Sequence, residues 1–307
     1  MDHDWSKLRG FNYMPSYSAH LQHTWTSFQP EVWEREVPWA LRFGSNCLRL
    51  WLDWSAFLAV GNAKLDALDQ ALSLLDANGL KAMPVLFNRW TDQLYPAGGV
   101  PNEVLLRADY GFRAFQPYVE TLADRFGKDE RILCWDLCNE PQAPWESVDV
   151  NLKEFAWLAW ASNQLRQRAT QPITIGTMFT DNVRLYAPLV DVISFHPYTR
   201  KLGEMATQCE MHLAIAAEYG KPLIATECCV GSLDDYERGV LAKDSIETLE
   251  RFDIGWQVWQ MVSGRFVTGS RERTDCNATR PWEGYMPFVL PDGTTRPYHE
   301  WLEGRQI

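Results

Sequence analysis

Residues 132–141 read Ile-Leu-Cys-Trp-Asp-Leu-Cys-Asn-Glu-Pro, a short and mostly apolar run that ends in residues suited to a loop. An amphipathic stretch, residues 152–168, follows and predicts a helix. Near-continuous apolar strands that alternate with helices are typical of a parallel sheet with helices on both faces. The stretch therefore predicts one strand-then-helix unit, with Asn139 and Glu140 at the carboxyl end of the strand.

The same unit recurs along the whole chain of 307 residues. The predicted strands are 8–13, 46–51, 81–87, 132–138, 172–178, 190–195, 222–226 and 254–260, and the predicted helices are 31–43, 64–78, 109–126, 152–168, 181–186, 204–219, 235–251 and 298–303. Eight such units favour closure into a (β/α)8 barrel of the α/β class. Because no linker or low-complexity stretch interrupts the alternation of strands and helices, we expect a single domain over residues 1–307. An open doubly wound sheet is disfavoured, since no Gly-rich turn follows the first strand.

Composition and charge exclude several classes of partner. The net charge of −11 and the sequence pI of about 5.1 argue against nucleic acid and against an anionic membrane surface, and they suit a neutral ligand. No apolar run is long enough for a transmembrane helix. The first four residues, Met-Asp-His-Asp, show no signal peptide, so we expect a cytoplasmic protein, although a chain with its signal removed would look the same.

The seven cysteines do not form a metal-binding or disulfide pattern. Five of them fall in or beside predicted strands, where a free thiol behaves as a small buried apolar side chain, which points to a reducing compartment: Cys47, Cys134, Cys138, Cys228 and Cys229. The adjacent Cys228 and Cys229 are not expected to bridge each other. We expect no metal and no other cofactor.

In a barrel of this kind the active site lies at the carboxyl ends of the strands. The polar or aromatic residues found in or at the ends of the predicted strands are Arg49, Asn88, Asn139, Glu140, His196, Tyr198, Glu227 and Trp259. Two of them, Glu140 and Glu227, are carboxylates that end different strands on the same rim. Glycoside hydrolysis requires two carboxyl groups that flank one bond, one protonated and one ionised. The pair therefore predicts glycosidase chemistry.

The motifs around both glutamates resemble those of clan A glycoside hydrolases. Trp135-Asp136-Leu137-Cys138-Asn139-Glu140-Pro141 is similar to the Asn-Glu-Pro signature of strand four. Ala225-Thr226-Glu227 resembles the nucleophile strand, and Ile193-Ser194-Phe195-His196-Pro197-Tyr198 resembles strand six. The pattern is most similar to glycoside hydrolase family 5, the cellulase and mannanase family, and the resemblance covers residues 8 to 303.

The resemblance implies a role for each residue at the rim. Glu140 is the expected acid/base and Glu227 the expected nucleophile of a retaining mechanism on β-linked oligo- or polysaccharides. Arg49 would hold the nucleophile ionised, and Tyr198 would donate to it. Asn139 would bind the sugar 2-hydroxyl, His196 would line the site, and Trp259 would form a platform under the sugar. The sequence is also compatible with structural roles for three of these residues. Arg49 would then be an ion-pair partner of Asp136 inside the barrel, and His196 and Trp259 would be core residues.

One position departs from the family pattern. Members of family 5 usually carry a His at the end of strand three, where this chain has Asn88. An Asn side chain can hydrogen-bond a sugar hydroxyl, but it does not titrate near neutral pH. The departure does not change the expected class of reaction. It is also compatible with membership of another clan A family, of the β-galactosidase, xylanase or transglycosylase type.

Aromatic residues in the predicted rim loops are candidates for sugar stacking, because an indole face packs well on the C–H face of a sugar. The candidate subsites are Trp25, Trp90, Trp145 and Trp282, each with an alternative reading as loop packing. Trp256, by contrast, is expected in the core. His20 and His23 have the types of metal ligands but lack a third ligand at a suitable spacing.

Two other classes of function fit the sequence less well than a glycosidase. A non-catalytic carbohydrate-binding barrel would have lost one of the glutamates, and both are present. An aldolase or a metal-dependent barrel hydrolase would need a strand-end Lys or a His-x-His after strand one, and neither occurs. The long stretch of residues 15–30 favours a cleft closed at one end, and hence short oligosaccharides or exo-type cleavage. The sugar configuration stays open at this point.

Overall fold

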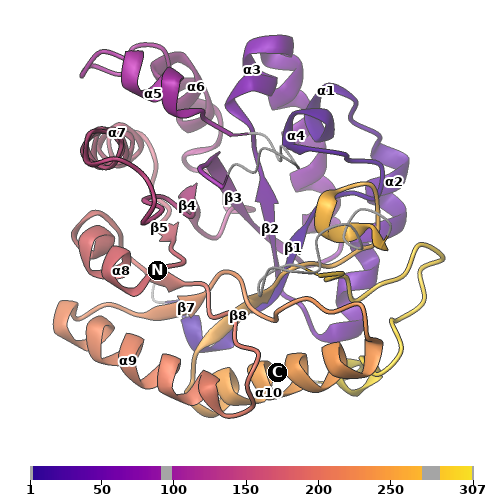
Figure 1. The fold of residues 1–307 in the computed structure, drawn as a ribbon. Coiled ribbons are helices and arrows are strands. Elements are labelled where there is room, and N and C mark those ends of the chain that lie inside the picture. The colour runs from indigo at the N-terminus through magenta and orange to yellow at the C-terminus, as the bar shows by residue number, and fades with distance from the viewer. Residues whose placement is uncertain (1–2, 91–98, 272–283, 306–307) are drawn as a thin grey trace.

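The computed structural model describes residues 3–90, 99–271 and 284–305. Eight parallel strands form one sheet in the order β5-β4-β3-β2-β1-β8-β7-β6, wound into a nearly closed barrel (Figure 1). The strands are β1 (Arg9–Tyr13), β2 (Cys47–Trp51), β3 (Lys81–Asn88), β4 (Trp135–Asn139), β5 (Ile173–Gly176), β6 (Ile193–Phe195), β7 (Leu223–Ala225) and β8 (Gly255–Val258). Each lies within a predicted strand or extends it by one residue, so the predicted (β/α)8 barrel is confirmed.

The seam between β5 and β6 closes the ring without a regular strand ladder. The backbone N–H of His196 donates to the carbonyl of Thr177 at 2.8 Å. Two threonine hydroxyls complete the seam: Thr174 Oγ1 donates to the Val192 carbonyl at 2.8 Å, and Thr177 Oγ1 donates to the Ser194 carbonyl at 2.7 Å. Since both side chains are buried, water cannot replace these bonds if they are lost.

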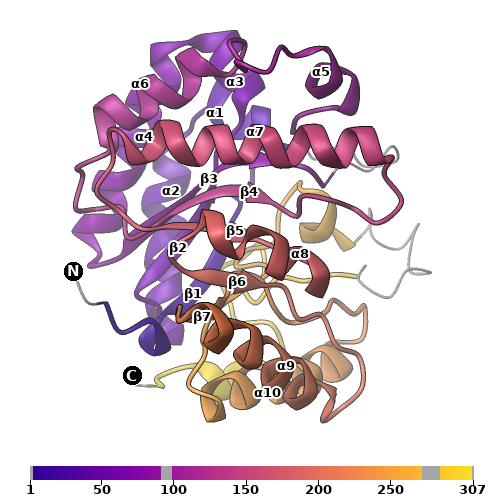
Figure 2. The same cartoon turned by 90° about the vertical axis from the view of Figure 1, so that its left-hand side faces the viewer.

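Helices cover the outside of the barrel (Figure 2). They are α1 (Leu21–Thr26), α2 (Pro30–Glu36), α3 (Trp54–Val60), α4 (Asn62–Ala77), α5 (Asn102–Arg107), α6 (Gln116–Phe126), α7 (Val148–Arg166), α8 (Thr180–Tyr186), α9 (Glu204–Tyr219) and α10 (Asp235–Arg251). Several begin at a side-chain cap that satisfies a free backbone N–H: Asp53 for α3, Ser147 for α7 and Asp234 for α10. In Figure 2, α7 lies across the outer face of the barrel, where it packs against β4.

The first, third and last predicted helices differ from those observed, and the third, predicted over 109–126, begins only at Gln116. The predicted helix 31–43 ends as an α-helix at Glu36 and continues as a 3-10 turn, Val37–Phe43, because Pro38 has no N–H and cannot continue the α-helical ladder. The predicted helix 298–303 is reduced to a single 3-10 turn, Glu300–Leu302. The short helices α1, α3 and α5 were not predicted, because six or seven residues show too little periodicity.

Apolar side chains from the sheet and from the inner faces of the helices form the core. Trp256 is 1% exposed and lies in this core, as predicted. The six cysteines among the described residues are free and buried. No helix in the described part of the chain is long and apolar enough to cross a membrane.

The seam between β5 and β6 predicts that the stability of the protein depends on the hydroxyl group of Thr174. Thr174→Val keeps the shape of the side chain but leaves the buried Val192 carbonyl without its donor, which should lower the free energy of unfolding by about 1–3 kcal/mol. Thr26→Val removes a similar bond, to the Gln22 carbonyl, on the exposed side of α1 and serves as the control. Urea unfolding of the three proteins checks this. Equal midpoints for the Thr174 and Thr26 variants would show that the seam does not depend on the hydroxyl.

Candidate active site

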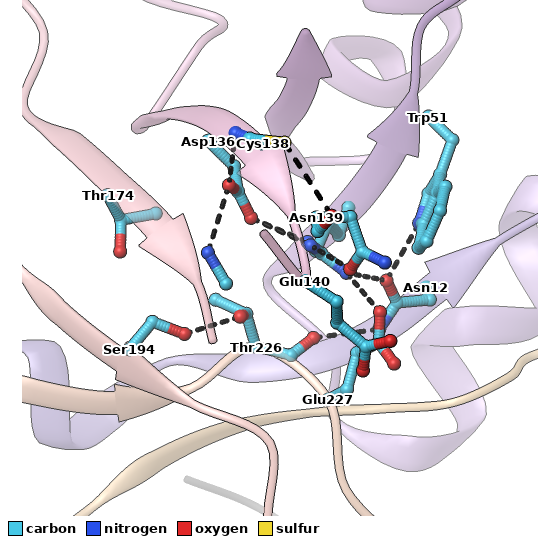
Figure 3. Close-up of polar contacts among 12 residues, drawn as sticks. Asn12, Trp51, Asp136, Cys138, Asn139, Glu140, Thr174, Ser194, Thr226 and Glu227 are labelled. Atoms are coloured by element: carbon cyan, nitrogen blue, oxygen red, sulfur yellow. Dashed lines mark hydrogen bonds and ion pairs between the residues drawn. The ribbon is translucent and has the colours of Figure 1, made fainter. Parts of the chain in front are cut away.

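The two predicted catalytic glutamates meet at the carboxyl rim of the barrel. Glu140 directly follows β4, and Glu227 lies two residues beyond β7. One carboxylate oxygen of each, together with a ring nitrogen of His196, lie within 4.8 Å of one another. Figure 3 shows the side chains of Glu140 and Glu227 ending close together, beside Asn12.

Arg49, from β2, occupies the centre of the site and is fully buried. Its five N–H groups are all used: Nε and Nη2 donate to Oδ2 of Asp136 at 3.0 and 2.8 Å, and Nη2 also donates to Asn139 Oδ1 at 2.9 Å. Nη1 donates to Asn12 Oδ1 at 2.7 Å and to Glu227 Oε1 at 2.6 Å. Arg49 therefore has both of the contacts that the sequence suggested, because it pairs with Asp136 and with Glu227 at once.

Glu227 has strong donors on both carboxylate oxygens. Oε1 accepts from Arg49, and Oε2 accepts from the hydroxyl of Tyr198 at 2.6 Å. The pKa of the Glu227 carboxyl is raised, chiefly by burial and further by the nearby Glu140, while Arg49 and the Tyr198 hydrogen bond oppose this shift without cancelling it. Because Arg49 is charged at every accessible pH and contacts the carboxylate directly, Glu227 is the member of the pair that carries the negative charge.

Glu140 lies in a different electrostatic setting, with no arginine in contact among the described ion pairs. Its Oε1 is 2.8 Å from Nδ1 of His196. Burial raises the pKa of the Glu140 carboxyl to about 7, opposed only by the more distant Arg49. Glu140 therefore keeps its proton over a pH range in which Glu227 is ionised, and such a division suits an acid and a nucleophile.

His196 connects Glu140 to the barrel wall. Its Nε2 lies 3.0 Å from Thr226 Oγ1, and burial lowers the pKa of its imidazole to about 4, so the ring is neutral. Gly176, at the end of β5, leaves the space that the ring occupies. A Cβ at Gly176 would lie 2.6 Å from His196 Nε2 and 2.8 Å from Arg49 Nη2. Glycine is therefore required here for space, since its backbone φ is ordinary.

Asn139 and Asn88 end neighbouring strands at the same rim of the barrel, and their side chains are hydrogen-bonded to each other. Asn139 accepts from Arg49 through Oδ1, and its Nδ2 donates to Asn88 Oδ1 at 3.2 Å. Asn88 Oδ1 also accepts from the Trp90 backbone N–H at 3.1 Å. The amide that replaces the expected histidine thus orients Asn139 and links it to the β3 loop.

An apolar wall flanks the polar cluster. It contains Met14, Leu21, Trp51, Val85, Trp259, Phe266, Val267 and Met286, with Trp90 and Tyr198 packed against it. Trp259 is 6% exposed, and its ring lies 4.9 Å from that of Trp51. Its indole Nε1 donates to Thr268 Oγ1 at 3.0 Å, which fixes the plane of the ring.

The four candidate aromatic subsites have different outcomes. Trp25 is 3% exposed and donates its indole N–H to the Trp51 carbonyl at 2.7 Å, so the prediction of a sugar platform there is wrong: the ring is a packing element. Trp90 is half-buried against the apolar wall. Trp145 is 71% exposed, with its ring edge-on to Phe179 at 5.9 Å. Trp282 lies outside the described residues.

Three residues of the site were missed by sequence reasoning. Asn12 accepts from Arg49 and from the Trp51 indole, and its own amide donates to the Thr226 carbonyl at 2.8 Å. A polar side chain inside the otherwise apolar first strand was the signal that could have revealed it. Thr226 and Gly176 carried no such signal, because their roles depend on contacts between strands distant in sequence.

Within residues 3–90, 99–271 and 284–305, Glu140, His196 and Glu227 form the one group of three potential metal ligands close enough to share an ion. Arg49 and Tyr198 already donate to Glu227, which leaves that carboxylate poorly suited to a cation. The ring nitrogens Nδ1 of His20 and His23 accept backbone N–H groups of their own loop, from His23 and Ala19.

The comparisons with known proteins identify the family of this chain. Residues 17–264 match the model of the family described as cellulase (glycosyl hydrolase family 5). The match covers most of the sequence, and the chain belongs to that family.

One curated relative and two solved structures show how similar this chain is to known proteins. A probable mannan endo-1,4-beta-mannosidase A from Aspergillus niger is 25% identical over 129 residues, which are 40% of this chain and 33% of that protein. An exo-beta-1,4-mannosidase from Opitutaceae bacterium strain TAV5 superposes with a TM-score of 0.75 at 15% identity, over 96% of this chain and 58% of that chain. An endo-beta-1,4-mannanase from Thermotoga petrophila gives a TM-score of 0.68 at 16% identity, over 97% and 76%. At these identities the two structures support the fold.

The raised pKa of Glu140 predicts how stability depends on pH. The folded state binds this proton more tightly than the unfolded state does, so the associated stability is fully present below 4.5, the ordinary pKa of a glutamate, and is lost as the pH rises through about 7. Glu140→Gln cannot ionise and should gain stability relative to the wild type between about pH 4 and about pH 8, by at most about 3 kcal/mol. Urea unfolding at both pH values measures this, with Glu103→Gln on α5 as the control. A difference between Glu140→Gln and the wild type that is the same at both pH values would contradict the assignment.

Proposed function

We propose that this protein is a retaining β-glycoside hydrolase with Glu140 as acid/base and Glu227 as nucleophile. The observation that carries the proposal is the approach of the two carboxylates to within 4.8 Å in opposite electrostatic settings. Retaining enzymes place their carboxyl groups about 5–5.5 Å apart, whereas inverting enzymes leave room for a water at about 6.5–9.5 Å.

In the first step, ionised Glu227 attacks the anomeric carbon, and the bond from that carbon to the leaving oxygen breaks. Glu140 gives its proton to the departing oxygen, so the product leaves as an alcohol. Glu227 becomes an ester, and Arg49 and Tyr198 lose a charged partner at that moment. Trp259 and the apolar wall would lie beneath the sugar, and Asn139 would bind its 2-hydroxyl.

In the second step, Glu140 is ionised and acts as the general base. It takes a proton from a water that attacks the anomeric carbon from the side of the departed group. The ester bond breaks, Glu227 returns to its ionised form, and the anomeric configuration is retained. No metal or organic cofactor enters either step, since the two carboxyl groups supply the nucleophile and all proton transfers.

The substrate class we propose is a β-1,4-linked mannoside. The support is that the curated relative and both solved structures carry names of mannan- or mannoside-cleaving enzymes. Exo-type cleavage of short chains is favoured by the stretch 15–30, where Leu21 joins the apolar wall and Trp25 is hydrogen-bonded to Trp51. These contacts hold the stretch against the site, beside the ends of β1 and β2, where it would close one end of the cleft.

A substrate screen tests the assignment of the sugar. The 4-nitrophenyl β-mannoside, β-glucoside, β-galactoside and β-xyloside should be compared, together with manno-oligosaccharides and mannan. We expect the mannoside to be the best aryl substrate and mannose to be released one unit at a time from the oligosaccharides. Hydrolysis of another sugar in preference to mannose would overturn the proposed substrate and leave the mechanism standing.

The two glutamates should differ in what each variant can still do. Glu227→Ala should lose activity on every substrate, and azide should yield an inverted glycosyl azide. Glu140→Ala should lose about 10²–10⁴-fold with poor leaving groups, but little in the first step with a dinitrophenyl glycoside, which needs no protonation. Azide should rescue this variant with retained configuration. If Glu140→Ala were equally inactive on activated and unactivated substrates, the role assignment would be wrong.

A further inference from the structure

The chain just after β4 adopts an uncommon backbone conformation. Glu140 and Gln142 both have positive φ values, +49° and +58°, in the left-handed region that non-glycine residues rarely adopt. Glu140 also precedes Pro141, and a residue in that position is normally extended. The pairing of β4 with β5 shifts register between Asp136 and Asn139, immediately before this turn. Such a conformation persists only when surrounding contacts hold it.

Two buried side chains from other helices hold the turn. Glu154, from α7, accepts the Gln142 backbone N–H through Oε1 at 2.9 Å. Asn182, from α8, donates through Nδ2 to the carbonyls of Pro141 and Gln142 at 3.1 and 2.8 Å. On the other side, the Glu140 N–H donates to the Gly176 carbonyl at 2.8 Å. The backbone that carries the Glu140 side chain is therefore fixed at four polar groups.

Arg89, the residue after β3, holds Glu154 in turn. Its Nε lies 3.3 Å from Glu154 Oε2, and both side chains are almost fully buried. The guanidinium also donates to the carbonyl of Val100 and to the side chain of Asn102. The Arg89 backbone N–H donates to the Asn139 carbonyl at 2.9 Å. Arg89 thus links the end of β3, the residue before Glu140 and the carboxylate that holds the turn.

We propose that Glu154 and Asn182 are positioning residues that hold the Glu140 carboxyl in line for proton transfer, with Arg89 anchoring Glu154. The proposal rests on the assigned role of Glu140 as acid/base. Among the described contacts, the Glu140 carboxyl touches one side chain, His196, so its direction is set chiefly by its own backbone. A general acid must lie within hydrogen-bond reach of the leaving oxygen, and a rotated turn would move it out of reach.

Substrates with different leaving groups show whether Glu154 and Asn182 position the Glu140 carboxyl or only support the fold. Asn182→Asp keeps the side-chain shape but sets an acceptor against two carbonyl oxygens. Glu154→Leu removes the acceptor of the Gln142 N–H, whereas Glu154→Gln keeps an acceptor and loses the charge. We expect kcat/KM on a 4-nitrophenyl or oligosaccharide substrate to fall about tenfold or more in Asn182→Asp and Glu154→Leu, and less in Glu154→Gln. On the dinitrophenyl glycoside all three should stay within about threefold of the wild type in the first step, because that step needs no acid.

Glu36 provides a matched control at a different strand end. It is also a fully buried carboxylate, and it accepts a loop backbone N–H, from Ser16 at 3.1 Å, and contacts an arginine, Arg35. The loop it holds follows β1 and carries no proposed acid. Glu36→Leu should therefore affect both substrates by the same factor, after correction for the folded fraction measured by thermal unfolding.

The outcomes distinguish this proposal from the proposed function. If Glu140→Ala discriminates between the two leaving groups while Asn182→Asp and Glu154→Leu slow both equally, the positioning role is wrong and the acid/base assignment stands. If Glu140→Ala itself does not discriminate, the assigned role of Glu140 fails first. Should Glu154→Leu not fold, because Arg89 is left buried without its partner, Asn182→Asp decides the question alone.

Discussion

The site depends on one buried guanidinium that faces two carboxylates. Arg49 has no exposed surface, and its charge is balanced on one side by Asp136 and on the other by Glu227. Removing one partner of such a buried pair costs about 3–5 kcal/mol, because the remaining charge has no water to solvate it. The cluster of one cation and two anions carries a net negative charge. Ionising Glu140 would add a third anion to the cluster, beside a neutral His196, and so Glu140 holds its proton to a higher pH than an ordinary glutamate does.

The barrel supports this arrangement through features that have little to do with sugar binding. Asn12 comes from β1, whereas Asp136 and Asn139 both come from β4, and each of the three uses an oxygen to accept from Arg49. Gly176 leaves the space in which His196 and Arg49 come together. The β5–β6 seam fixes the backbone of His196 through the Thr177 carbonyl. Glu140, Glu227 and the groups that separate their charges are thus positioned by contacts within the barrel itself.

The strands and the two glutamates could be predicted from sequence because their signals are local. A buried parallel strand is an apolar run of a few residues, and a carboxylate at its end is visible in the same stretch, as at Asn139-Glu140-Pro141. What could not be predicted depends on distant contacts. Trp25 has the sequence surroundings of a rim tryptophan, yet it is buried because its indole meets the Trp51 carbonyl. Likewise, nothing near Glu154 or Asn182 in the sequence indicates that both reach the turn after Glu140.

We propose that Arg49 keeps Glu227 ionised as the group that attacks the sugar, and trapping the covalent intermediate tests this role most directly. A 2-deoxy-2-fluoro mannoside with a dinitrophenyl leaving group slows both steps but still allows the first, so a glycosyl-enzyme should accumulate. The trapped protein should then be digested with pepsin and its peptides sequenced by mass spectrometry. We expect one added sugar per chain, on the peptide that contains Glu227 and on that side chain. A sugar attached to Glu140 or Asp136, or hydrolysis of the same substrate with inversion and no trapped species, would contradict it.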